Sequence, residues 1–158
     1  VLVEAARIAR GKISKLAEIN PDDLDALIMP GGFGAAKNLS TLAFEGANAT
    51  VNPDLIHLVR AMHKAKKPIG AICISPAVIS KILYKHGVTL TIGSDSDTAS
   101  VIQTMGNKHE LSSADNIVVD VENRIVSTAA YMCAVSIGEA GLGIEKLVGH
   151  IMGMIEKT

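Results

Sequence analysis

Cys73 is the residue whose type and setting best suit covalent chemistry. The apolar residues 68–73 predict a short buried strand, and Ser75 followed by Pro76 predicts a helix with Ser75 as its N-cap. Cys73 would then lie on the turn between strand and helix, where the partly positive helix N-terminus favours a nucleophilic thiolate. The alternative is a small apolar cysteine that only fills space. This segment alone does not separate the two interpretations.

Gly31 and Gly32 are candidate partners of this thiol. Residues 24–29 predict another short strand, which runs directly into the glycine-rich residues 30–34. Glycines at the carboxyl end of a strand let the backbone turn sharply and point its amides at a ligand. The spacing fits neither the Walker motif nor the dinucleotide fingerprint. We therefore expect a tight connection or, together with Cys73, an oxyanion-binding site.

The composition indicates one α/β domain that spans residues 1–158. Hydrophobic residues make up 48% of the chain but aromatic residues only 3%, which is typical of buried parallel strands rich in aliphatic side chains. The formal net charge of -1 does not favour nucleic acid or an anionic membrane as a partner. No apolar run reaches membrane-spanning length. The two cysteines, Cys73 and Cys133, have no paired spacing, which favours a reduced, intracellular protein without a metal site.

The remaining elements follow from periodicity and capping signals. We expect a helix that begins after Asn52-Pro53 and buries an apolar stripe, with His57 and His63 facing outward. Residues 35–51 predict a long loop of small residues, which we expect to lie over the pocket. The other expected elements are a helix at 2–11, a helix at 76–86, a strand at 88–92, a helix from 94 to 106, a hairpin of 117–121 with 124–127, and a helical region at 131–157.

Several motifs along the chain carry a family resemblance. The most specific is the run Pro30-Gly31-Gly32-Phe33-Gly34-Ala35-Ala36-Lys37-Asn38-Leu39-Ser40. Further matches lie at residues 4–11, 67–70, 73–74, 91–93, 117–120 and 131–132. These motifs resemble those of the ElbB/ES1 group, a branch of the DJ-1/PfpI superfamily. The similarity spans nearly the whole chain.

The resemblance implies a fold and a reaction. The fold would be a flavodoxin-like three-layer sandwich of the class I glutamine-amidotransferase-like type, with the N-terminal βαβ portion absent from this chain. The resemblance implies Cys73 as the nucleophile and the amides of Gly32 and Ile74, beside Gly31, as the oxyanion site. Related bacterial proteins are described as glyoxalases, which convert a 2-oxoaldehyde such as glyoxal or methylglyoxal to its hydroxy acid without glutathione.

The same resemblance sets further expectations. We expect no cofactor, a small-molecule aldehyde as substrate, a homodimer, and a cytoplasmic location, or a mitochondrial one in a eukaryote. The group is also labelled with an association to isoprenoid biosynthesis, so an accessory role there is an alternative. Another alternative is a non-catalytic stress or redox protein in which the thiol of Cys73 is reversibly oxidised.

The chain departs from the superfamily pattern at positions that matter for the chemistry. The protease-like branch has a histidine directly after the cysteine, where this chain has Ile74. The ready-made Cys–His pair is therefore missing, which argues against peptidase or glutaminase activity unless His57 or His63 turns inward. The superfamily's acidic partner of the cysteine, a glutamate, comes from the absent N-terminal portion. No residue here takes that role by motif.

Overall fold

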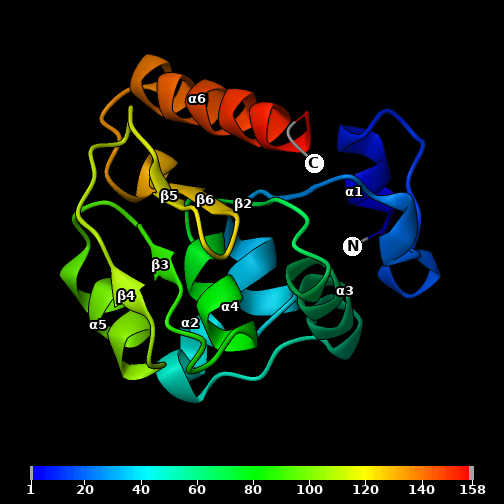
Figure 1. The fold of residues 1–158 in the computed structure, drawn as a ribbon, viewed down its shortest axis with the longest axis horizontal. Helices are drawn as coiled ribbons and strands as arrows, with labels where there is room; N and C mark the ends of the chain where they lie inside the picture. The colour runs from blue at the N-terminus through cyan, green and yellow to red at the C-terminus, as the bar shows by residue number, and fades with distance from the viewer. Residues whose placement is uncertain (1, 157–158) are drawn as a thin grey trace.

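A four-stranded sheet forms the centre of the computed structural model, which describes residues 2–156. In spatial order its strands are β1 (Leu27–Met29), β2 (Ile69–Ile72), β6 (Ile125–Thr128) and β5 (Val118–Asp120). Strands β1, β2 and β6 are parallel, and β5 pairs antiparallel with β6. A separate parallel pair consists of β3 (Thr89–Leu90) and β4 (Lys108–His109) (Figure 1).

Helices cover both faces of the central sheet, which gives three layers (Figure 1). Helix α6 (Ile137–Ile155) lies on one side, while α3 (Pro53–Lys64) and α4 (Ser75–Ile82) lie on the other. The fold class is therefore the flavodoxin-like α/β sandwich that we expected. The parallel direction of β1, β2 and β6 matters for function, because ligands of such sheets bind at the carboxyl ends of the parallel strands.

Strand β2 is buried on both faces because its neighbours cover it completely. Ile69 and Ala71 pack in the core with α3 and α4, whereas Ile72 packs with the apolar face of α6. Gly70 allows α6 to approach closely, because a Cβ atom there would lie 2.9 Å from a methyl group of Leu147. This central strand leads directly to Cys73.

Helix α3 forms as its sequence predicts. The side chain of Asn52 accepts hydrogen bonds from the amides of Asp54 and Leu55 at 2.9 and 3.2 Å, which caps the helix N-terminus. Its buried stripe consists of Leu55, Leu58, Val59 and Met62. His57 is exposed, and His63 is half-buried with Nε2 3.0 Å from Oδ1 of Asn123.

Several predicted elements are wrong in extent. Residues 35–51 are not a plain loop but a π-helical turn (Gly34–Asn38), α2 (Leu42–Glu45) and a 3₁₀ turn (Gly46–Asn48). Strand β4 was not predicted, because two residues carry no pattern. The expected helical region at 131–157 is a 3₁₀ turn (Ala130–Met132) and then α6, with residues 133–136 between them; its last residue, 157, lies outside the described part.

Other elements keep their predicted type but are shorter. These are α1 (Leu2–Ile8) in place of 2–11, β1 in place of 24–29, α4 in place of 76–86, β3 in place of 88–92, and α5 (Ser96–Thr104) in place of 94–106. The hairpin of β5 and β6 is confirmed. Two further 3₁₀ turns, Leu16–Glu18 and Pro21–Asp23, lie in the N-terminal connection.

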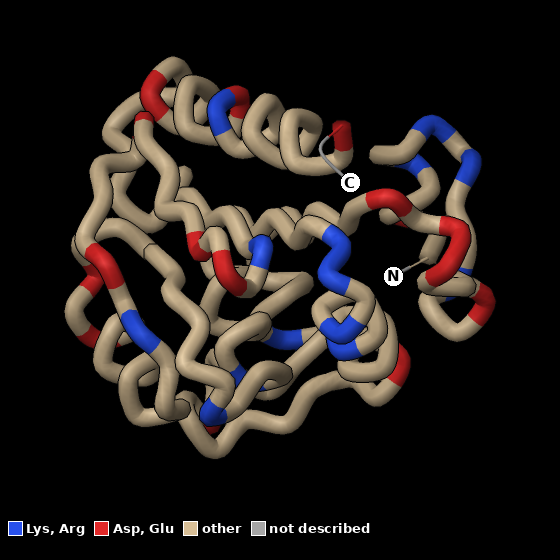
Figure 2. The backbone as a smooth tube through the Cα atoms, in the orientation of Figure 1, with Lys and Arg blue, Asp and Glu red and all other residues tan. Residues whose placement is uncertain are grey.

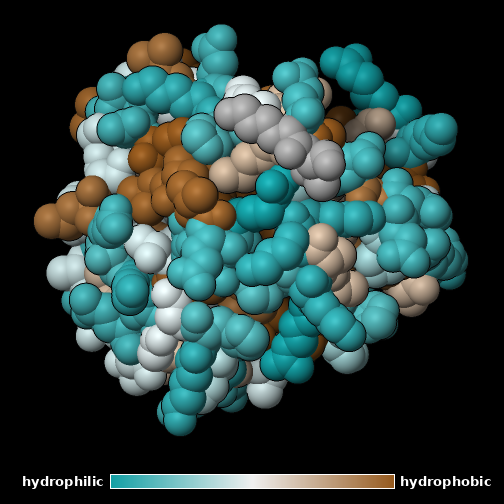
Figure 3. All heavy atoms as spheres, viewed as in Figure 1, coloured by the Kyte–Doolittle hydropathy of each residue, from teal (hydrophilic) through white to brown (hydrophobic). Residues whose placement is uncertain are grey.

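Lys, Arg, Asp and Glu residues are interspersed along the chain without separation of the two signs (Figure 2). The face in Figure 3 is mostly hydrophilic, but hydrophobic side chains gather near β5 and at the start of α6. Val135 and Ile137, which flank the N-cap of α6, are 94% and 82% exposed. Of the helices within residues 2–156, none combines the length and apolar character needed to cross a bilayer.

Candidate active site

Cys73 lies between the end of β2 and the start of α4, as its sequence context predicts. Its φ angle is +62°, a conformation that non-glycine residues adopt only at a cost of about 1–2 kcal/mol. The amide of Cys73 donates a hydrogen bond to the carbonyl oxygen of Thr128, at the end of β6, at 2.9 Å. The side chain is half-buried and its thiol is free.

The glycine-rich residues after β1 lie beside this cysteine. Because Met29 pairs in register with Ala71, the two strands deliver Gly31 and Cys73 to the same edge of the sheet. A Cβ atom at Gly31 would lie 2.6 Å from the Cβ of Cys73 and 3.0 Å from the backbone nitrogen of Ile74. Gly31 must therefore remain a glycine for this close approach.

Ser75 has a different role from the one its sequence predicts. The residue at the N-cap position of α4 is Ile74, whose side chain makes no capping hydrogen bond. Ser75 is the first helical residue, and its hydroxyl donates to the carbonyl oxygen of Pro30 at 2.8 Å. The prediction of Ser75 as N-cap is thus wrong, because the hydroxyl reaches a segment that is distant in sequence. Ser75 joins the two halves of the site.

A cavity of about 520 Å³ opens beside Cys73. Gly32 and Ile74, the two residues proposed for the oxyanion site, also line it, whereas Gly31 supports Cys73 from outside the lining. Gly32 has φ +83°. Within residues 2–156, neither the Gly32 amide nor the Ile74 amide donates a hydrogen bond to another part of the chain. Both amides are therefore available to an oxygen atom in the cavity.

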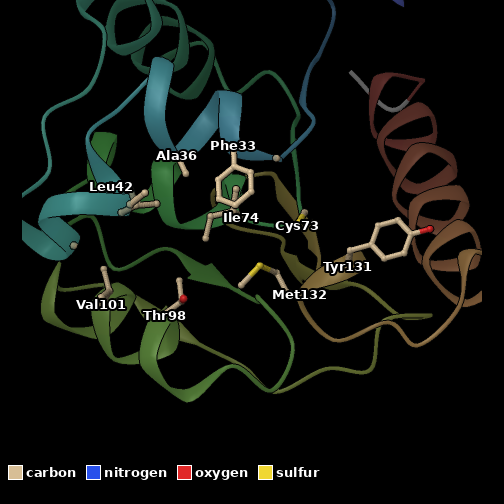
Figure 4. A pocket seen from close by; sticks show the side chains of 12 residues that line it. Phe33, Ala36, Leu42, Cys73, Ile74, Thr98, Val101, Tyr131 and Met132 are labelled. Atoms are coloured by element: carbon tan, nitrogen blue, oxygen red, sulfur yellow. The ribbon is translucent and has the colours of Figure 1, made fainter.

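The rest of the lining was only partly anticipated. Ala36, Leu42, Ala43 and Gly46 come from the segment 35–51 that we expected as a loop over the pocket, and they do line the cavity, as does Phe33 of the glycine-rich residues 30–34. Thr98 and Val101 of α5 and Tyr131 and Met132 were missed. In Figure 4 these side chains surround the space in front of Cys73, with Tyr131 directed away from it toward α6. The signal available for α5 was that it follows β3 after a short connection, residues 91–95.

The lining holds few groups that can move protons. Among the described residues that line it, only Cys73 and Tyr131 have ionisable side chains, and none is a histidine. His63 instead faces Asn123, in the turn between β5 and β6 at the opposite ends of the strands, and His57 is exposed on α3. Neither histidine is oriented toward Cys73, as glutamine hydrolysis would require. Within residues 2–156, no group of three or more metal-binding side chains is present.

Comparison with known proteins establishes the family. The model of the DJ-1/PfpI family matches residues 12–136, which is most of the chain. The chain belongs to the DJ-1/PfpI family. Among DJ-1/PfpI relatives, the rat protein named "ES1 protein homolog, mitochondrial" is 39% identical over 166 residues, which cover 99% of this chain and 62% of the rat protein.

Two further relatives agree with this placement. The human "Glutamine amidotransferase-like class 1 domain-containing protein 3, mitochondrial" is also 39% identical, with 61% of its length covered. A crystal structure of an "isoprenoid biosynthesis protein with amidotransferase-like domain" from Ehrlichia chaffeensis superposes with a TM-score of 0.88 at 40% identity, covering 96% of this chain and 69% of that one. The chain thus spans about three-fifths of the length of the curated relatives it matches.

Proposed function

We propose that the protein is a cysteine-dependent glyoxalase that converts a small 2-oxoaldehyde, such as glyoxal or methylglyoxal, to a 2-hydroxy acid without glutathione. One observation carries the proposal: the thiol of Cys73 and the unpaired amides of Gly32 and Ile74 line the same cavity. A nucleophile next to two free amides suits an attack that creates a negatively charged oxygen. The substrate is then held by a covalent bond rather than by a cofactor.

The proposed reaction balances without an external oxidant or reductant. The sulfur of Cys73 bonds to the aldehyde carbon, and the carbonyl electron pair moves to the oxygen, which the two amides stabilise until it is protonated. A proton then leaves this carbon and one is added to the neighbouring carbonyl carbon, while the hydroxyl proton passes to the neighbouring oxygen, so that the first carbon becomes a thioester and the second an alcohol. Water cleaves the thioester, releases the 2-hydroxy acid and restores the thiol.

The proton transfer between the two carbons requires an acid/base group. The superfamily resemblance assigns it to a glutamate that no motif of this chain supplies, and the described cavity lining contains no carboxylate or imidazole. General acid–base catalysis contributes about 10²–10⁴-fold to such reactions. In this proposal Cys73 and the amides supply the covalent step, and the acid/base group is one that the described lining does not contain.

The test compares two cysteine variants. Methylglyoxal consumption and lactate formation should fall by at least about a hundredfold in Cys73→Ser, because serine is a far weaker nucleophile without a base beside it. Cys133→Ser is the matched control, since Cys133 is also free and half-buried but does not line the cavity. Equal turnover by Cys73→Ser and the unaltered protein would contradict the proposal.

A second candidate function is a redox or stress protein without turnover. It is favoured by the half-buried free thiol of Cys73 together with the missing acid/base group in the described lining. In that case mild peroxide should oxidise Cys73 reversibly to the sulfenic acid, in preference to Cys133. Peptide mass spectrometry after treatment distinguishes the two sites. Resistance of Cys73 to oxidation would count against this function.

The assembly and location are also proposed. We propose a homodimer, with the exposed apolar residues at the start of α6 as its contact surface. An accessory role in isoprenoid biosynthesis remains the alternative that the name of the Ehrlichia chaffeensis protein suggests. We also propose a cytoplasmic location, or a mitochondrial one in a eukaryotic cell, and the names of the rat and human relatives support the mitochondrial one.

A further inference from the structure

The cavity extends well beyond the thiol. Figure 4 shows Cys73 and Met132 on one side, and Leu42 of α2 with Val101 of α5 on the other. Gly46 also lines this far end, and a Cβ atom there would lie 3.7 Å from a methyl group of Val101. Its lack of a side chain therefore keeps space open between α2 and α5. We call this far end, formed by Leu42, Gly46 and Val101, the apolar chamber.

The chemistry of the lining restricts what the chamber can hold. Among residues 2–156, no charged side chain lines the cavity, and the polar side-chain groups directed into it are the thiol of Cys73 and the hydroxyl of Thr98, since Tyr131 points away toward α6 (Figure 4). The nearby cation, Lys37, lies outside the lining with its ammonium 4.4 Å from the centre of the Phe33 ring. A carboxylate or phosphate on the substrate would therefore find no partner in the chamber, and it would lose its hydration.

The size of the cavity also indicates a substrate with an apolar side chain larger than a methyl group. A volume of about 520 Å³ lies in the range of pockets that enclose drug-sized ligands, roughly 300–1,000 Å³. Methylglyoxal has one methyl group beside its two carbonyls, so it would leave the chamber unfilled while bonded to Cys73. An uncharged side chain that reaches Leu42 and Val101 would remove apolar surface of both partners from water.

We propose that the apolar chamber is a specificity subsite for the side chain of the 2-oxoaldehyde, and that it selects aliphatic or aromatic side chains of about six carbons over hydrogen or methyl. This inference rests on the proposed function, because it assigns the substrate class of the same thiol. The aldehyde carbon bonds to Cys73 as described above, and the side chain lies between α2 and α5. Each methylene group that the chamber buries should raise kcat/KM roughly fourfold.

The first experiment measures kcat/KM for phenylglyoxal and methylglyoxal. The ratio should favour phenylglyoxal by at least about tenfold. In Val101→Phe, which fills the chamber, this ratio should fall by about tenfold or more. Gln103→Phe is the matched control, because Gln103 is exposed on the same helix and does not line the cavity. A ratio near one, or equal ratios in both variants, would overturn the proposal.

A second experiment separates the chamber from the catalytic reaction. The rates at which N-benzyl-iodoacetamide and iodoacetamide alkylate Cys73 are measured by peptide mass spectrometry, which resolves Cys73 from Cys133. Each rate is divided by the rate at which the same reagent alkylates glutathione. The benzyl reagent should react at least about tenfold faster at Cys73, and Val101→Phe should abolish this preference. Preference without aldehyde turnover supports the chamber and overturns only the glyoxalase function. If the benzyl reagent shows no preference at Cys73, the proposed role of the apolar chamber is overturned, even where the protein turns over aldehydes.

Discussion

At the scale of single residues, the site depends on how the backbone of Cys73 is held. Its φ of +62° is a strained conformation that the surrounding structure must maintain. Two hydrogen bonds do this, from the Cys73 amide to Thr128 and from the Ser75 hydroxyl to Pro30. Gly31 adds a steric constraint, because the residue packs against the Cβ of Cys73. Cys73 thereby lines the cavity while it also packs against the core cluster beside α6.

Gly31→Ala should disrupt this arrangement. The new methyl group would lie 2.6 Å from the Cβ of Cys73 and 2.7 Å from the carbonyl oxygen of Ile72, and neither neighbour is the flexible end of a side chain. We expect the free energy of unfolding to fall by about 1–3 kcal/mol and the alkylation rate of Cys73 to change. Urea denaturation and iodoacetamide kinetics measure the two effects.

The control for this prediction is Gly34→Ala, three residues further along the chain. A Cβ atom at Gly34 would have no neighbour within 4 Å, so this variant should keep both stability and alkylation rate. If Gly31→Ala behaves like Gly34→Ala, the close contact with Cys73 is not needed to position the thiol.

The residues of the site were predictable to different degrees. The positions of Cys73 and Gly32 are predictable from their neighbours in sequence, because each follows a predicted strand and lies at a turn signal. Val101 does not, because it is one apolar residue on a helix whose facing partner is 59 positions away at Leu42. Ser75 was assigned the wrong partner for the same reason. Local capping rules cannot include a carbonyl oxygen from another strand end.

At the scale of elements, Asn107 joins helix α4 to the short strands. Its side-chain amide donates to the carbonyl oxygens of Ser80 and Leu83 at 2.9 and 3.2 Å and lies 2.9 Å from the Ser80 hydroxyl. Its oxygen accepts from the amide of Val88 at 3.1 Å. Asn107 is only 5% exposed, so water cannot replace these bonds.

Asn107→Ala should therefore be strongly destabilising. It leaves the amide of Val88 without its acceptor in the interior, and we expect a loss of about 3 kcal/mol in the free energy of unfolding. Thermal and urea denaturation measure this loss. Gln103→Ala, at an exposed position four residues earlier, should stay within about 0.5 kcal/mol of the unaltered protein. Similar stabilities of the two variants would refute the assigned role of Asn107.

His109 in β4 makes a pH-dependent contribution to the free energy of unfolding. Burial lowers the pKa of His109 below its ordinary value of 6.5, and the neighbouring Glu110 opposes this effect. The amide of Ile92 donates to Nε2 of the ring at 3.4 Å, which requires that nitrogen to be unprotonated. Because the folded pKa is the lower one, the stabilisation is present above pH 6.5 and is lost as the pH falls through the folded value.

The measurement is stability against pH for His109→Gln. Glutamine keeps an acceptor oxygen but does not titrate in this range, so the decrease of stability below pH 6.5 should become smaller than in the unaltered protein. Identical pH profiles for the two proteins would show that His109 does not contribute.

The predictability of elements follows their length and their dependence on distant contacts. Helix α3 was predicted well because a cap and an apolar stripe specify it locally. The short helices of residues 35–51 depend on contacts that periodicity does not reveal. The hydroxyl of Ser40 donates to the carbonyl oxygen of Ala35 at 2.8 Å, and the side chain of Leu42 is buried in the core. A segment this short folds because its neighbours hold it.

At the scale of the whole molecule, the two cores on either side of the sheet fix the position of the site. Leu147 and Ile151 of α6 pack over Gly70 on one face, and α3 and α4 pack on the other. The carboxyl ends of β1 and β2 are thereby held side by side. The cavity then forms where α2 and α5 approach this edge.

The exposed apolar residues at the start of α6 lead to a prediction about assembly. We expect the protein to form a homodimer and Val135→Asp combined with Ile137→Asp to weaken it by at least about tenfold, because a buried carboxylate would lose its hydration. Sedimentation velocity over a range of concentrations measures the effect. The exposed Val121, at the end of β5, gives the control variant Val121→Asp, which should leave the dimer unchanged. A monomer at every concentration would contradict this prediction.

The sequence by itself determined the α/β class, the family resemblance and the place of Cys73 between strand and helix, because these depend on neighbouring residues and on motifs. Only the tertiary structure decided which residues share the cavity with the thiol. Leu42, Thr98 and Val101 lie in helices that are distant in sequence, and packing against the sheet brings them together. The tertiary structure also decided that the Ser75 hydroxyl donates its hydrogen bond to the carbonyl oxygen of Pro30, because a hydrogen bond depends on distance in space rather than along the chain.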